Sequence, residues 1–217
     1  QFRALGAWVL TGVLGTAAWV LWAGTTGIGQ VFSFRGSKGW QIESLPGNVL
    51  FLLDPGAAHV EGGAWRTAVE VPDPLRWSLT FGSFALVALA WWWADQRHRG
   101  DDAAAFGLAP LASVTALLVF ATIISPQYVL WLLPFAAIAT VGTIGRAPGD
   151  RRLGLVIGGI VFAVVALTTF EFGMIRWMVL DQDLFPAMLV LLRNAALVAL
   201  MALTYQRLAN RRPIADP

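Results

Sequence analysis

Long apolar runs separated by short polar clusters dominate the chain. Each run approaches the roughly 20 helical residues needed to cross a hydrocarbon core about 30 Å thick. Because a helix satisfies its own backbone hydrogen bonds in lipid, and because the runs lack the alternation of barrel strands, each run predicts a transmembrane helix. The expected spans are residues 4–23, 78–94, 106–124, 128–145, 153–170 and 184–205. The pattern therefore predicts an all-α integral membrane protein with about six transmembrane helices.

The longest polar stretch, residues 24–77, contains two shorter elements. Residues 45–53 are apolar but too few to cross a membrane, which predicts a re-entrant or interfacial helix. After the Gly62-Gly63 pair, apolar or β-branched side chains recur at every second position, and this predicts a small β-hairpin over residues 59–71. The alternating residues are Trp65, Thr67, Val69 and Val71.

Prolines modify the later spans. Ser125, Pro126 and Gln127 predict a tight connection, because proline lacks an amide hydrogen and disfavours helix in the residue before it. Pro134 predicts a kink in the fourth span, since its ring blocks a hydrogen bond one turn back. A polar segment over residues 171–183 is expected to separate the last two spans.

The composition supports this interpretation. Apolar residues make up 57% of the 217 residues and charged residues 13%, against about 25% charged in soluble domains. The mean hydropathy is +0.66, and the pI near 9.7 reflects basic residues at the ends of apolar runs. Such a distribution indicates orientation in a bilayer and not a nucleic-acid partner. The absence of cysteine excludes disulfides and thiol chemistry.

Basic residues set the expected orientation, because the side richer in arginine and lysine faces the cytoplasm. The richer set of loops carries Arg3, Arg97, Arg99, Arg146, Arg151, Arg152, Arg207, Arg211 and Arg212. The other set carries Arg35, Lys38, Arg66, Arg76 and Arg176. We therefore expect a multi-pass protein of the plasma membrane, with the 24–77 loop extracytoplasmic and the C-terminus cytoplasmic.

The chain begins at Gln1, and its first methionine is Met174. We expect residues 1–217 to form a single transmembrane domain that is the C-terminal part of a longer protein. Removal of a signal peptide is the alternative, although a processed N-terminus rarely runs straight into a membrane span.

Arg193 is the most informative single position, because it falls near the middle of the sixth expected span. A charge there costs at least about 2.5 kcal/mol, so the guanidinium needs a partner. One hypothesis is an internal cavity in which Arg193, supported by Asn194, holds an anion such as a lipid phosphate. An ion pair with Glu43 or Glu171, or snorkelling to the surface, explains the residue equally well.

The outer loop contains a second candidate group within FRGSKGWQIES, residues 34–44. Cations suit a diphosphate or phosphodiester, an indole offers a stacking face for a sugar, and a carboxylate accepts hydroxyl protons. An ordinary solvated loop with one interfacial tryptophan is the alternative, and residue types alone favour it. The candidate residues are Arg35, Lys38, Trp40, Gln41 and Glu43.

Two further pairs of residues are weaker candidates for a binding site. Gln127 and Tyr128 interrupt the apolar pattern where two spans meet, and they suit a ligand or a simple turn between helices. His59 with Glu61 lacks a third metal ligand in register, so we interpret both as surface residues and expect no metal site and no cofactor.

Three stretches together resemble a known family: RGSKGWQIESLPGNVLFLL, ISPQYVLWLLPF and LLRNAALVAL. They are similar to bacterial polyprenyl-phosphate-dependent glycosyltransferases of the GT-C fold. The resemblance is to glycosyltransferase family 87 in particular, which includes actinobacterial mannosyl- and arabinosyltransferases, and it covers most of the chain.

This resemblance implies an enzyme that moves a sugar, mannose or arabinose, from a polyprenyl-phosphate donor to a lipid or glycan acceptor outside the membrane. It also implies that the catalytic aspartate lies in the N-terminal half of such proteins. Because we expect this chain to be the C-terminal part, we assign no catalytic residue here. Donor or acceptor binding carries over to the five loop residues above and to Gln127, Tyr128 and Arg193. A secondary transporter and a noncatalytic membrane scaffold remain the alternatives, although transporters usually place polar groups near the midplane in paired halves.

Overall fold

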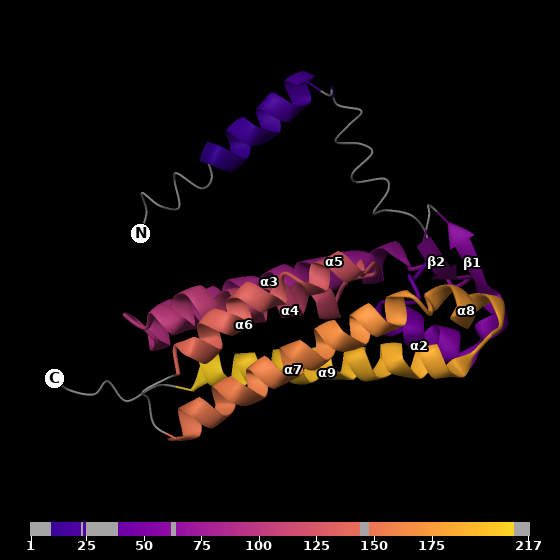
Figure 1. Cartoon of the computed structure of the whole chain (residues 1–217). Helices are drawn as coiled ribbons and strands as arrows, with labels where there is room; N and C mark the ends of the chain where they lie inside the picture. Colours follow the sequence, from indigo (N-terminus) through magenta and orange to yellow (C-terminus); the bar gives the residue numbers. More distant parts are fainter. Residues whose placement is uncertain (1–9, 23, 25–38, 62–63, 144–147, 211–217) are drawn as a thin grey trace. The chain divides into compact units, whose positions relative to one another are not determined.

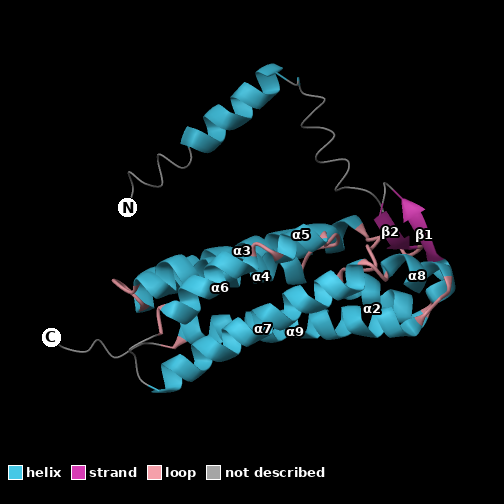
Figure 2. Ribbon diagram, viewed as in Figure 1, coloured by secondary structure: helices cyan, strands magenta, loops and turns pink. Residues whose placement is uncertain are grey.

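The computed structural model describes residues 10–22, 24, 39–61, 64–143 and 148–210. Helices make up most of this part, together with one two-stranded hairpin (Figures 1 and 2). The backbone contacts divide the chain into two units, residues 1–38 and residues 39–217. The helical character confirms the predicted all-α class, and each unit is described by itself.

Three helices in the described part are long and apolar enough to span a membrane. They are α3 (Asp73–Arg97), α7 (Pro148–Phe172) and α9 (Leu184–Ala209). At 1.5 Å per residue, each exceeds a hydrocarbon core of about 30 Å. The apolar helices at the other expected spans are shorter: residues 10–22, 104–119 and 126–141. The protein is thus a helical membrane protein, while the number of six spans stays a prediction.

The longer helices of residues 39–217 pack around one apolar core, and a second, smaller apolar cluster contains Phe51, Met178 and Val190. Helix α7 lies beside α9, and α4 (Ala109–Val119) packs against both α3 and α9. Fully buried Leu111, Leu132, Val164 and Leu200 from four helices form the core. Figure 1 shows α2 (Leu45–Leu53), α8 (Ile175–Leu180) and the hairpin gathered at the end of this bundle where α9 begins. We call this the loop end.

The third expected span is shorter than predicted and contains a π-helix over Ala104–Leu108. Pro110 follows it and has no N–H to donate, and the Ala109 N–H bonds to the Ala104 carbonyl five residues back. Such π-bulges occur where the regular ladder is interrupted. The helix ends at Val119, and not at residue 124, so the prediction of its C-terminal boundary was wrong.

Pro134 interrupts the fourth expected span as predicted, but the helix breaks where a kink was expected. Helix α5 (Pro126–Val129) and α6 (Leu132–Val141) are separated by two turn residues. Pro134 cannot donate to the Leu130 carbonyl, which instead accepts from Leu133 N at 3.2 Å. The missing amide hydrogen thus moves the break one turn ahead of the proline.

The predicted short helix and hairpin are both present in the long loop. Helix α2 spans Leu45–Leu53, and strands β1 (Ala58–Glu61) and β2 (Ala64–Thr67) pair antiparallel. The second strand ends at Thr67, so the predicted extension to residue 71 was wrong. The loop also ends earlier than residue 77, because α3 starts at Asp73 with Pro74 in its first turn, where no amide hydrogen is needed.

The polar segment before the last helix is also shorter than expected. Helix α7 continues to Phe172 and so places Glu171 in its last turn, whereas the sequence pattern assigned Glu171 to the connection. A short helix, α8 (Ile175–Leu180), then leads to α9. Asp183 caps α9 by accepting a hydrogen bond from Phe185 N at 2.9 Å.

The start of α2 provides a test of this fold. A Cβ added at Gly47 would lie 2.0 Å from the backbone oxygen of Gln41, so Gly47→Ala must push the preceding loop away. We expect a loss of about 1–3 kcal/mol, as for other overpacked sites, measured by thermal unfolding in detergent. Gly82→Ala in α3, with no atom within 4 Å, is the control. It should gain about 0.5–1 kcal/mol, and equal melting temperatures for both variants would contradict the assigned packing.

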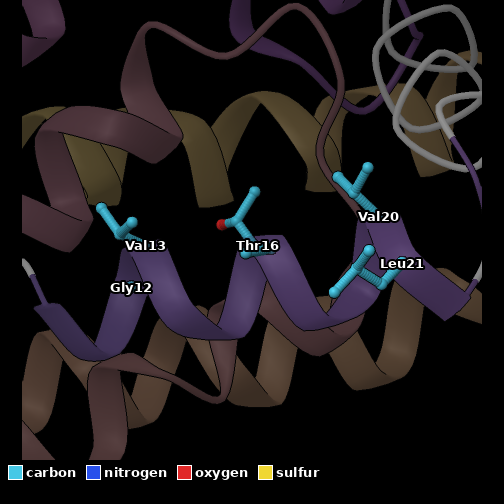
Figure 3. Close-up of a pocket in the computed structure, with 6 residues that line it drawn as sticks. Gly12, Val13, Thr16, Val20 and Leu21 are labelled. Atoms are coloured by element: carbon cyan, nitrogen blue, oxygen red, sulfur yellow. The ribbon is translucent and has the colours of Figure 1, made fainter.

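The first unit contains a shorter apolar helix over Leu10–Trp22. An open hollow along it is lined by Gly12, Val13, Thr16, Ala17, Val20 and Leu21. Figure 3 shows Val13, Thr16 and Val20 projecting from the same side of this helix. The lining carries no charge, and Thr16 supplies its single hydroxyl, so this face offers little polar chemistry.

Candidate functional site

Helix α2 lies antiparallel along the first turns of α9 at the loop end. Asn48 Nδ2 donates to the Ala187 carbonyl at 3.1 Å. Further along α9, Arg193 Nη2 donates to the carbonyl of Glu43, which precedes α2, at 2.5 Å, and Asn194 Nδ2 donates to the same oxygen at 3.3 Å. The loop before α2 is therefore attached to α9 through the Glu43 carbonyl.

Arg193 is fully buried and paired inside the protein. Its Nη1 lies 3.4 Å from Glu171 Oε1. The predicted ion pair with Glu171 is thus confirmed, and with 0% exposure the guanidinium does not snorkel.

The position of Arg193 along the bundle differs from the prediction. Glu171 is in the last turn of α7, so Arg193 lies level with the end of that helix. The earlier part of α9, residues 184–192, packs beside α2 and α8. Arg193 therefore lies where the bundle meets the loop elements, because the first turns of α9 extend past the end of α7.

Glu43 is a buried acid with a perturbed pKa. Its side chain is 8% exposed, and Oε2 has no hydrogen-bond partner among the described residues. Burial raises the pKa of Glu43 from 4.5 to about 7, and the charge of Glu171 adds to this. The Glu43 backbone, Arg193 and Gln41 act in the opposite direction but do not compensate for the burial.

A second buried guanidinium, Arg66, was not identified from the sequence. It is 1% exposed, its Nη1 donates to the Gly39 carbonyl at 2.9 Å, and its Nε lies 3.7 Å from Glu61 Oε2. Burial lowers the pKa of Arg66, against the charges of Glu61 and Glu43. Strand alternation places Arg66 on the face opposite to Trp65 and Thr67. In an isolated hairpin that face would be exposed to solvent, so Arg66 is buried only because the loop covers it.

The backbone of the loop is held closely against β2. Ile42 N donates to the Trp65 carbonyl at 3.0 Å, and Thr67 N donates to the Trp40 carbonyl at 2.9 Å. Gly39 has φ +91°, and a Cβ there would lie 2.9 Å from the Thr67 carbonyl oxygen. Residues 39–44 are therefore an ordered segment, which we call the anchor segment.

The anchor segment also reaches the connection between α4 and α5. Gln41 N donates to the Thr122 carbonyl at 3.1 Å, and Gln41 Oε1 accepts from Ile124 N at 2.8 Å. These bonds occupy backbone groups that a longer α4 would use, which explains the early end of that helix. They also bring Gln41 near the Ser125-Pro126 segment.

The other predicted site residues differ in their exposure. Trp40 is 4% exposed, so the protein covers its indole ring. Gln127 is exposed and accepts a hydrogen bond from Ser125 Oγ at 2.6 Å. Tyr128 is half-buried, with its ring centroid 5.0 Å from that of Trp131. Arg35 and Lys38 lie outside the described residues.

Potential metal ligands do not gather in the described part of the chain, where no group of three histidine, cysteine or acidic side chains is found. His59 is exposed on β1, and Glu61 faces Arg66. The polar chemistry of the loop end thus comes from carboxylates, guanidinium groups and amides.

No known family model, curated protein or solved structure matches this chain. The resemblance to glycosyltransferases therefore depends on its three sequence stretches. The three stretches meet at the loop end: Gln41 bonds to the backbone of Thr122 and of Ile124, where the second stretch begins, and the Glu43 carbonyl accepts hydrogen bonds from Arg193 and Asn194 of the third.

Proposed function

We propose that this chain is part of a membrane glycosyltransferase of the GT-C type. It would transfer a sugar, mannose or arabinose, from a polyprenyl-phosphate donor to a lipid or glycan acceptor at the extracytoplasmic face of the plasma membrane. The observation that carries the proposal is the meeting of the three family-like stretches at one end of the bundle. Apolar helices resemble one another easily, but hydrogen bonds between polar side chains of one stretch and the backbone of another are not a general property of such helices.

The basic residues that precede the anchor segment in the sequence suit the reaction. Displacing a phosphate leaving group from an anomeric carbon builds negative charge on the phosphate, so fixed cations at the membrane boundary stabilise the transition state. Arg35 and Lys38 directly precede the anchor segment in the sequence, and we assign them to the donor phosphate. Gln127 and Tyr128 are assigned to the sugar or the acceptor as hydrogen-bonding side chains.

We assign Arg193, Gln41 and Glu43 a structural role, and not the direct contact with donor or acceptor that the resemblance implies. The Arg193 guanidinium is fully buried, and it contacts Glu171 and the Glu43 carbonyl. We therefore assign it as a positioning residue that holds the anchor segment. Trp40, which is also buried, supports the same segment by packing.

The direct test is transfer of radiolabelled sugar from polyprenyl-phosphate donors in membranes containing the full-length protein. Arg35→Gln and Lys38→Gln should each reduce transfer at least tenfold, the effect of about 1.4 kcal/mol on a barrier. Arg99→Gln is the matched control, because this arginine pairs with Asp95 at the opposite end and its side chain is 75% exposed. Membranes that make no labelled product from any such donor would refute the proposed activity.

A secondary transporter is the second candidate, favoured by one observation. Ionisable residues buried in a membrane protein often mark ion or proton pathways, and Glu43, Glu171 and Arg193 form such a group. Sealed vesicles distinguish the candidates: uptake of a solute without a glycosylated product would favour the transporter.

A further inference from the structure

The buried cluster around Arg193 has more free hydrogen-bond acceptors than free donors. Among the described residues, the unpartnered buried acceptors are Glu43 Oε2, Glu171 Oε2 and Asn194 Oδ1. Among these three residues and Arg193, the unpartnered buried donor is Arg193 Nε. Buried polar atoms without partners are expensive, so the cluster requires a further hydrogen-bond donor.

The charges of the cluster point in the same direction. In the described part of the chain, the charged groups that interact with Glu43 are Arg193 from α9, Glu171 from α7 and Arg66 from β2. Arg66 is already engaged with Glu61 of β1 and with the Gly39 carbonyl. Two buried carboxylates therefore depend chiefly on the Arg193 guanidinium, and full ionisation of both would leave a buried negative charge.

We infer that Glu43 and Glu171 form a proton-binding site that holds one proton between them and thereby keeps the anchor segment attached to α7 and α9. The bound proton converts one carboxylate oxygen into an O–H donor for the acceptors around it. Its release to water leaves two carboxylates beside one guanidinium. The two carboxyls interact, so the ionisation of Glu43 depends on the state of Glu171.

The proton links attachment of the anchor segment to pH. When the segment detaches, Glu43 becomes solvated and ionises at its ordinary pKa of 4.5, whereas burial raises the pKa of the attached form to about 7. Detachment thus releases a proton between these values, and the detached fraction grows as the pH rises through this window. The use of this dependence in sugar transfer rests on the proposed function, whereas the proton-binding site does not.

Infrared spectroscopy of the protein in detergent tests proton binding directly, without substrate. At about pH 6, wild type should show the carbonyl stretch of a protonated carboxylic acid, and the band should disappear on titration to about pH 9. Glu43→Gln and Glu171→Gln should both lack it, because each leaves one carboxylate for Arg193. A spectrum in which neither variant differs from wild type would overturn the inference.

A cysteine-free chain allows a second test, of attachment. Ile42→Cys introduces a thiol at a fully buried position of the anchor segment, and Leu53→Cys, at a position 78% exposed on α2, corrects for the reactivity of the thiol. The labelling ratio of the two should rise about tenfold per pH unit between pH 5 and 7, then level off. It should be independent of pH in the Glu43→Gln background. A ratio independent of pH in the wild-type background would refute the coupling.

The two proposals fail separately. An infrared band that behaves as expected in a protein that transfers no sugar supports the proton site and removes the proposed function. Sugar transfer by a protein whose infrared spectrum lacks the carboxylic-acid band supports the proposed function and removes the proton site.

Discussion

Replacing Arg193 by methionine is expected to lower the free energy of unfolding by about 3–5 kcal/mol, the usual effect of removing one partner of a buried ion pair. The substitution leaves the Glu171 carboxylate buried without its cation and removes the 2.5 Å hydrogen bond to the Glu43 carbonyl. Thermal unfolding in detergent, followed by tryptophan fluorescence, measures the change.

Two further variants separate this effect from a general loss of charge in α9. Arg207→Met removes an arginine of the same helix that pairs with Asp150 at the opposite end, where both side chains are partly exposed, so about 1 kcal/mol should be lost. Combining Arg193→Met with Glu171→Met removes both buried charges and should recover part of the stability, since apolar replacements of buried ion pairs are often tolerated. A double variant less stable than Arg193→Met would show that this pair is not the main interaction of Arg193.

Raising the pH from about 4.5 to about 7 is expected to reduce the stability of the folded protein by about 3 kcal/mol through Glu43 alone. The pKa of this carboxyl is raised to about 7 in the folded state, so folding takes up a proton within this window. The contribution of Glu43 to stability is complete below pH 4.5 and is lost as the pH approaches 7. Unfolding measured at several pH values in one detergent gives the slope.

Glu43→Gln is the matched variant for this dependence. The amide cannot ionise and has nearly the shape of the protonated acid, so stability should be almost constant over the same pH range. Glu61→Gln, at a carboxyl 36% exposed near Arg66, should leave the slope of wild type largely unchanged. If Glu43→Gln retained the full slope, the titrating group would have to be another residue.

The helical elements followed closely from sequence, because each depends on local properties. Residues 45–53 were predicted as a short helix and form α2 with these bounds, since Ser44 caps the helix and Asp54 follows it. The hairpin was also predicted from a local property, the alternation of side chains after two glycines. The boundary errors at α3, α4 and β2 arose where prolines or distant hydrogen bonds, such as those of Gln41, decide where an element ends.

The candidate site was predictable only in part. Arg193 was identified because a charge in an apolar helix must have a partner, and Glu171 was one of the two acids considered. Arg66 was missed because an arginine in a polar loop carries no signal in the sequence, although it is among the largest fully buried side chains. Its burial depends on the anchor segment, which lies more than twenty residues away along the chain.

The amino-acid sequence by itself determined that this is a helical membrane protein, that a short helix and a hairpin lie in its long loop, and that Arg193 needs a partner. Hydrophobic periodicity and the cost of a buried charge act on each segment separately, so they can be read along the chain. Only the tertiary structure decided that Glu43, Glu171, Arg66 and Arg193 meet at one end of the bundle. Burial and charge coupling arise from distances between segments far apart in the sequence, and the raised pKa of Glu43 therefore exists only in the folded protein.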